Sequence, residues 1–417
     1  MLNPLAMLAL VAAVNGAAAP IADDGEGRML IRHVSASQMG IVFSYAGDLW
    51  RVPLAGGAVE QLTAGPEDDD FPAVSPDGLH IAFSRRVADG WDLYVMPAQG
   101  GEPRRLTWDP NADIARGWTP DGSRILFVSH WSDDALSRLY TVGLEEAHPV
   151  PLPLPRGWDG SFEPGGNRIA YVPYSLLYEL DGSEWRGYRG GRMSRIDLAD
   201  LEDSSVEPIP ASDANDRDPM WMGNTIYFVS DRSGTFNLHA YDPQTREIQQ
   251  LTEYETYGID DASAAAGVVT FVQDGRLRVW NVQSGTITDI TLQLAPQRSE
   301  LEPRTVAAGD FIQSASPSAA GDKILFSARG DVLMLDLASG EAENLTETSG
   351  AVEREPVMSP DGRWVAYFSD DSGDYQLHVR PVTDEGPIRH IPVELQSSFY
   401  RELVWSPDSK RLAFSDK

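Results

Sequence analysis

Short runs of apolar, β-branched and aromatic residues recur along the chain, and clusters of polar turn residues precede many of them. The tetrapeptide Ser75–Gly78 (Ser-Pro-Asp-Gly) is followed by Ile-Ala-Phe at 81–83, and Thr119–Gly122 by Ile-Leu-Phe at 125–127. Proline fixes φ at the second turn position, aspartate hydrogen-bonds the turn backbone, and glycine accepts a positive φ. Each phrase therefore predicts a β-hairpin whose tight turn leads into a buried strand.

The phrase returns at 359–362 and 406–409, with a weaker copy at 163–166. The repeating unit is roughly 40–45 residues long, a period typical of a propeller blade of four strands. Six complete units fit between residues 29 and 292, so we predict an all-β fold that begins with a six-bladed β-propeller. The predicted second strands are the clearest elements: 41–44, 81–84, 125–128, 169–172, 226–229 and 268–271.

Residues 293–305 break the repeat with two prolines and several charges, which indicates an inter-domain linker. The repeat then resumes at 306–346 and 355–393, and a third unit opens at 403–405 before the sequence stops at Lys417. A propeller needs a closed ring to remove its sheet edges. We therefore interpret 306–417 as the first blades of a second, truncated β-propeller, and expect the chain to be a fragment of a longer protein.

Composition removes several classes of function. The chain has 417 residues, is 42% hydrophobic and carries a net charge of −30, so it can bury real cores but would repel a nucleic-acid backbone. It has no cysteine, which excludes disulfides and thiolate metal sites. We expect no cofactor and no metal.

The first twenty residues suit a leader. An apolar core at 5–14, too short for a bilayer span, is followed by small residues at 16–19. We predict a signal peptide over 1–20 and a periplasmic or exported protein, with the cytoplasm as the alternative. No other stretch is suited to spanning a membrane.

Catalytic motifs are missing from the sequence. It contains no Gly-x-Ser-x-Gly elbow, His-Glu-x-x-His pair or phosphate-binding loop, and its seven histidines fall at unrelated repeat positions. We assign no catalytic residue, and the serines of the turn phrase are expected to be turn formers. The acidic run 67–70 is expected to be a solvated turn, with a cation site at a channel mouth as the alternative.

The fourth unit carries an insertion at 173–193. It includes Arg186, Arg189 and Arg192 among aromatic and glycine residues, a positive island in an acidic chain. Such a loop suits contact with a carboxylate or with an acidic face of another domain. Alternatively, its arginines pair with nearby acids and the loop is structural.

The repeated phrase resembles the propeller repeats of TolB and of propeller-bearing peptidases. The segment 184–191 (Glu-Trp-Arg-Gly-Tyr-Arg-Gly-Gly) and the order of two propellers resemble tricorn-type serine peptidases. That resemblance implies an enzyme that cuts short peptides from oligopeptides. Its six-bladed and seven-bladed propellers gate substrate access and product exit, and its PDZ-like and peptidase domains follow. The serine, histidine and glutamate of that family would lie outside this chain, which should be inactive alone and homo-oligomeric when full length.

The resemblance also points to Arg116. In the archetype, an arginine pair after a Leu-Thr of the second blade holds the substrate C-terminus, and the corresponding loop here, 108–116, has a single arginine. Arg116 is therefore a candidate for binding peptide substrate, together with Arg186, Arg189 and Arg192. A structural Arg116, paired with an acid such as Asp113, is the alternative.

Two other functions stay open. A non-enzymatic, TolB-like propeller of the periplasm would work through protein contacts and would end near a completed ring. The accessory propeller of a prolyl-oligopeptidase-type enzyme would be followed by a Gly-x-Ser-x-Gly hydrolase domain. The start of a second propeller argues against that last reading.

Overall fold

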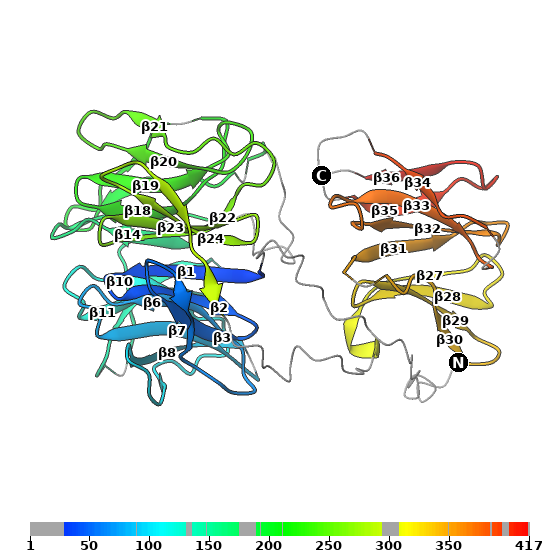
Figure 1. Ribbon diagram of the computed structural model, residues 1–417, viewed down its shortest axis with the longest axis horizontal. Coiled ribbons are helices and arrows are strands. Elements are labelled where there is room, and N and C mark those ends of the chain that lie inside the picture. The colour runs from blue at the N-terminus through cyan, green and yellow to red at the C-terminus, as the bar shows by residue number, and fades with distance from the viewer. Residues whose placement is uncertain are drawn as a thin grey trace. The chain divides into compact units, whose positions relative to one another are not determined.

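The computed structural model confirms an all-β protein (Figure 1). It describes residues 29–415 except for 89, 131–135, 147, 175–188, 192, 211, 294–307, 349, 384–385 and 394–399. The described residues form two compact units, 29–293 and 308–415. Among them, no helix is long and apolar enough to cross a membrane. The predicted leader, nearly all of the predicted linker and most of the insertion at 173–193 lie outside the described residues.

The unit 29–293 contains six four-stranded antiparallel sheets among its described residues, each a meander in sequence order. The first strands are β1 (Ile31–Ser37), β6 (Asp69–Val74), β10 (Ile114–Trp118), β14 (Asp159–Phe162), β18 (Asp216–Met222) and β22 (Ile259–Ala265). The second strands are β2 (Gly40–Tyr45), β7 (His80–Val87), β11 (Arg124–Ser129), β15 (Arg168–Val172), β19 (Thr225–Ser230) and β23 (Val268–Gln273). All six predicted second strands lie inside these elements.

In each sheet the fourth strand, at the outer edge, is the shortest. The third strands are β3 (Asp48–Val52), β8 (Gly90–Pro97), β12 (Arg138–Gly143), β16 (Asp197–Asp200), β20 (Asn237–Tyr241) and β24 (Arg276–Asn281). The fourth strands are β5 (Glu60–Gln61), β9 (Arg104–Arg105), β13 (Val150–Pro151), β17 (Val206–Pro208), β21 (Ile248–Gln250) and β25 (Ile287–Asp289).

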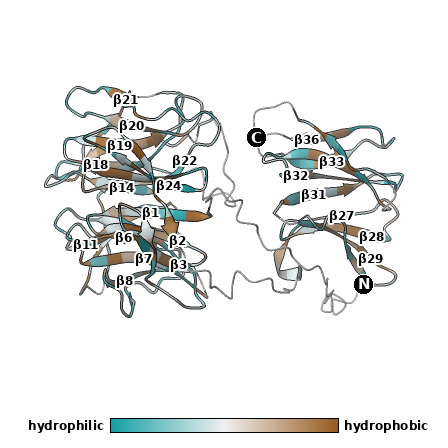
Figure 2. Ribbon diagram, viewed as in Figure 1, coloured by the Kyte–Doolittle hydropathy of each residue, from teal (hydrophilic) through white to brown (hydrophobic). Residues whose placement is uncertain are grey.

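Hydrophobic packing between neighbouring sheets forms the core. Figure 2 shows hydrophobic stretches on second strands such as β2 and β19. Their side chains are fully buried, as Phe43, Phe127 and Phe228 illustrate with 0% exposure. At about 25 cal/mol per Å² of buried apolar surface, these second strands supply much of the driving force for folding.

The predicted turns form as the sequence indicates. The Ser75 hydroxyl donates to Asp77 at 2.6 Å and accepts from the His80 amide at 2.9 Å, while Gly78 has φ +73°. Thr119 and Asp121 repeat the side-chain contact at 2.6 Å. The prediction that these hydroxyls are turn formers is confirmed.

A second repeated contact joins the third and fourth strands. The Thr107 hydroxyl, just after β9, accepts the Leu93 amide of β8 at 2.9 Å. Thr63 and Thr252 accept the amides of Leu49 and Leu238 at 3.0 and 2.9 Å. A buried backbone N–H is thus satisfied where the short fourth strand has ended.

The first and sixth sheets are neighbours, which closes the ring of sheets. β26 (Leu292–Gln293) pairs in parallel with β4 (Gly57–Ala58), and Figure 1 shows the yellow-green end of the unit beside the blue first sheet. The Ala36 amide of β1 also donates to Ser263 of β22 at 3.1 Å. Apolar side chains of both sheets share one core cluster.

The unit 308–415 starts with the short 3₁₀ helix η3 (Ala308–Phe311) and repeats the same meander. Its first sheet has β27 (Ile312–Pro317), β28 (Lys323–Ala328), β29 (Asp331–Asp336) and β30 (Ala342–Asn344). The next has β31 (Glu353–Met358), β32 (Trp364–Ser369), β33 (Gln376–Pro381) and β34 (Arg389–Ile391), followed by the hairpin of β35 (Arg401–Trp405) and β36 (Leu412–Ser415).

Candidate functional site

A cavity of about 530 Å³ lies at the centre of the unit 29–293, and the first strand of all six sheets lines it. The hairpin turns after these strands form one end. Six side chains nearer the beginnings of the strands line the other end, and we call them the inner ring: His33, Phe71, Arg116, Asp159, Asp218 and Asp261. Each sheet contributes one member, so the fold brings together residues that are far apart in sequence.

Irregularities of the backbone occur at several of these residues and direct their side chains toward the cavity. The pairing register shifts at His33 in β1, across 71–72 in β6, at Arg116 in β10 and across 218–219 in β18. His33, Phe71 and Asp218 adopt left-handed φ values of 37°, 55° and 49°. A β-bulge leaves a residue unpaired and redirects its side chain, and backbone strain of this kind is concentrated at functional sites.

One half of the inner ring is cationic and aromatic. His33 Nδ1 lies 2.7 Å from Asp70 Oδ1, and its ring centroid is 3.9 Å from that of Phe71. Burial opposes protonation of His33, but the Asp70 carboxylate outweighs this effect and raises the pKa of the imidazole. Burial likewise works to raise the pKa of Asp70, yet the attraction of His33 prevails and lowers it. The two groups form an ion pair at the edge of the cavity.

Arg116 supplies the second cation. Its guanidinium carbon lies 4.9 Å from the centroid of Trp158 and 5.7 Å from that of Phe71. Within the part of the chain that the structure describes, its Nε and Nη2 have no hydrogen-bond partner. The alternative pairs Arg116 with an acid such as Asp113; an acid that the guanidinium attracts is Asp159, whose pKa it works to lower against the larger effect of burial. Asp113 is fully buried elsewhere, and burial raises its pKa to about 7.

The other half of the ring is acidic. Burial raises the pKa of Asp218 to about 6, with repulsion from Asp159 adding to the rise, and raises that of Asp261 to about 6, with repulsion from Asp218. Burial also raises the pKa of Asp159. Asp261 accepts the Val34 amide at 2.5 Å, so one carboxylate is also tied to the first sheet. The cavity therefore presents cations from the first and third sheets opposite acids from the fourth, fifth and sixth.

The structure does not gather all four predicted arginines. Arg189 donates to Asp231 Oδ2 at 2.7 Å, and that aspartate is 2% exposed, which supports the structural alternative for this arginine. Arg186 and Arg192 lie outside the described residues. Of the predicted set, Arg116 lines the cavity.

The expectation of a solvated turn at 67–70 is wrong for its second half. Asp69 and Asp70 belong to β6 and are buried, because Asp69 pairs with Arg85 at 2.6 and 2.8 Å and Asp70 pairs with His33. Glu67 and Asp68 are exposed as expected.

Sequence reasoning missed His33 and the three aspartates of the ring. The first strands are polar and irregular, so they lack the apolar run that marks the second strands. A usable signal is the turn: counting back five to seven residues from its glycine reaches the ring in every sheet. Those glycines are Gly40, Gly78, Gly122, Gly165, Gly223 and Gly267.

Comparison with known proteins extends this picture. Residues 28–286 match the family model described as the tricorn protease N-terminal beta propeller domain. The chain is 28% identical over 385 residues to tricorn protease homolog 1 of Streptomyces coelicolor, covering 89% of this chain and 35% of that protein. It therefore spans about a third of that relative's length.

A solved structure shares the fold, and a further relative matches in sequence over part of the chain. The crystal structure of the tricorn protease aligns with a TM-score of 0.57 at 18% identity, covering 93% of this chain and 47% of that one. A TolB homolog of Chlorobium chlorochromatii is 26% identical over 150 residues, covering 36% of this chain and 32% of that protein.

Proposed function

Because this chain belongs to the family of tricorn protease N-terminal β-propeller domains, we propose that it is the propeller region of a tricorn-like serine peptidase that degrades oligopeptides. In this proposal residues 29–292 are a six-bladed propeller, 293–305 a linker and 306–417 the first blades of a second propeller. The PDZ-like and peptidase domains lie outside this chain, which by itself binds and guides peptides without cleaving them.

The two-signed inner ring is the observation that carries the proposal. A short peptide with free ends has a carboxylate and an ammonium group. Two nitrogens of Arg116 have no hydrogen-bond partner among the described residues, so this side chain suits the carboxylate. Asp159, Asp218 and Asp261 suit the ammonium. Trp158 and Phe71 hold the guanidinium in place and shield it from water.

Calorimetric titration of the full chain with short alanine peptides tests this role. Arg116→Met should weaken binding of a peptide with a free C-terminal carboxylate by about 10–100-fold, the value of a charge-assisted hydrogen bond. The substitution should leave the binding affinity for the C-terminal amide of the same peptide unchanged. The control is Arg104→Met, because Arg104 is exposed on β9, away from the cavity.

Equal losses for the acid and the amide, or equal losses in the two variants, would contradict a carboxylate site at Arg116. The peptidase part has its own test. The chain joined to its downstream domains should hydrolyse peptides, and the chain alone should not. Hydrolysis by the chain alone would contradict the proposal that this chain binds peptides and that a separate domain cleaves them.

The match to a TolB homolog favours a second candidate, a protein-binding propeller without peptidase activity. The exported location predicted from residues 1–20 is part of both proposals. In the second, the cavity mouth contacts a protein partner, and substitution of Arg116 leaves the binding of short peptides unchanged.

A further inference from the structure

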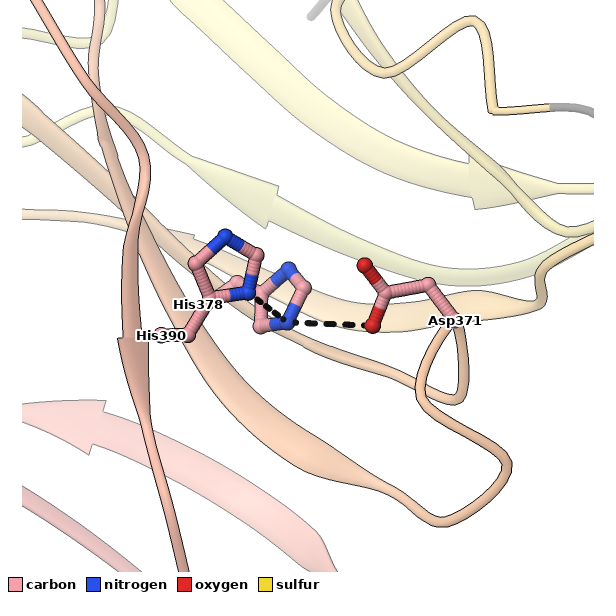
Figure 3. A group of neighbouring side chains, drawn as sticks. All are labelled: Asp371, His378 and His390. Atoms are coloured by element: carbon pink, nitrogen blue, oxygen red, sulfur yellow. Dashed lines mark hydrogen bonds and ion pairs between the residues drawn. The ribbon is translucent and has the colours of Figure 1, made fainter.

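Three side chains with metal-binding atoms meet in the sheet β31–β34 of the unit 308–415, whereas the inner ring belongs to the unit 29–293 (Figure 3). His378 on β33 is the direct register partner of His390 on β34. Asp371 follows the end of β32 and turns back toward His378. The group therefore joins two strands and a loop of one sheet.

The distances suit a common ligand. His378 Nε2 lies 3.0 Å from His390 Nδ1 and 3.5 Å from Asp371 Oδ1, and all three ligand atoms are within 4.8 Å of one another. Zinc binds nitrogen and oxygen at about 2.0–2.2 Å, so its tetrahedral ligand atoms are about 3.3 Å apart. Two of the three edges are already near that value, and small movements of the exposed Asp371 and His390 would complete the triangle.

The chemistry of the three groups suits a metal as well. The His378 side chain is 4% exposed and packs edge-on against Tyr367, with ring centroids 5.5 Å apart. An imidazole nitrogen is a common zinc ligand, and the packing against Tyr367 fixes the position of the His378 ring. Asp371 and His390 are exposed, which leaves an open side for a water as fourth ligand.

We propose that His378 Nε2, His390 Nδ1 and Asp371 Oδ1 form a Zn²⁺ site. Two imidazoles and one carboxylate favour zinc over magnesium or calcium, which prefer all-oxygen sites. The bound ion would fasten the outermost strand β34 to β33 and to the loop after β32. The site is independent of the peptide-binding role proposed above.

The experiment is a calorimetric titration of the full chain, purified without a histidine tag and freed of metal with a chelator. ZnCl₂ should bind with one equivalent, and MgCl₂ should give no saturable binding. His390→Ala should weaken zinc binding by about 100-fold, as expected for the loss of one ligand. His148→Ala is the matched control, because His148 is an exposed histidine of the other unit.

Asp371→Asn should weaken binding by about tenfold, since an amide oxygen is a poorer zinc ligand than a carboxylate. Both substitutions are at exposed positions, so the fold should persist, and circular dichroism checks this. Zinc should also raise the thermal unfolding temperature of wild type and of His148→Ala but not of His390→Ala. No saturable zinc binding by wild type, or equal affinities for His390→Ala and His148→Ala, would overturn the proposal.

Discussion

The hairpin turns and the inner ring occupy opposite ends of the cavity, on the same first strands, yet they differ in kind. Two of the turns share one chemistry, in which a hydroxyl meets an aspartate at 2.6 Å, at 75–78 and 119–122. The same contact recurs in the unit 308–415, at 359–362 and 406–409. The ring uses histidine, phenylalanine, arginine and three aspartates at comparable positions. Repetition marks the scaffold of this protein, and variation between the sheets marks the place where specific chemistry is found.

The two ends also differ in their effect on stability. A satisfied turn stabilises its sheet, whereas burial of a carboxylate costs free energy. For Asp218 the ion pair with Arg217, at 4.0 Å, offsets this cost only in part. Substitutions should therefore act in opposite directions at the two ends. The following predictions compare the inner ring with the contacts and turns that repeat through the sheets of both units, from the largest expected effect to the smallest.

Asp218→Asn should stabilise the protein by about 1–3 kcal/mol at pH 8. The pKa of Asp218 is raised to about 6, so its share of stability is fully present below the pKa of the unfolded chain and is lost as the pH rises through 6. Asparagine removes the charge and tolerates the left-handed φ of 49°. Urea unfolding at pH 4 and pH 8 measures the effect. The exposed Asp213→Asn is the control, and a gain that is equal at the two pH values would refute the explanation.

Thr107→Val should lower the free energy of unfolding by about 1–2 kcal/mol, because the buried amide of Leu93 loses its acceptor. Thr252→Val should cost a similar amount, since the same contact recurs there with Leu238. Thr107→Ser keeps the hydroxyl and should restore most of the loss. Denaturant unfolding of the three variants measures these changes. Very different losses of unfolding free energy in Thr107→Val and Thr252→Val would show that the repeated threonine contact does not contribute equally at the two sites.

Gly362→Ala should destabilise the unit 308–415 by about 1 kcal/mol, the cost of a left-handed φ for a residue with a Cβ. The value here is +70°, and the added Cβ would meet no atom within 4 Å, so the cost is conformational alone. The reverse change, Ser409→Gly, relieves φ +58° but loses a 3.1 Å bond from the Asp361 amide. It should gain less than 1 kcal/mol by the same measure. A loss in Ser409→Gly as large as that in Gly362→Ala would contradict this account.

The strands that sequence predicted well are those whose burial shows as apolar runs. Residues 125–128 fall within β11 because both faces of that strand are covered, and no polar interruption hides it. The first strands were not predicted, because bulges and charges break the alternation of apolar and polar residues. In β18, for example, Arg217 and Asp218 precede a proline.

The chemistry of the cavity depends on pairings that local patterns do not contain. His33 meets Asp70 across 37 residues, and this contact exists only when two sheets pack side by side. The histidine pair is closer in sequence, 12 residues apart, yet it requires the exact register of β33 with β34. Arg116 was found through a resemblance, and its surroundings became clear only from the fold.

The pairing of β26 with β4 has a mechanical consequence. Each of the six sheets is built from one continuous segment of chain, so no sheet shares strands between the two ends of the unit. Parting the first and sixth sheets would therefore break the short β26–β4 ladder, a few side-chain hydrogen bonds and the apolar cluster that the two sheets share. It would leave the six four-stranded sheets whole. A pulling force on the chain after Gln293 would act directly on the β26–β4 ladder, which holds the ring of sheets closed.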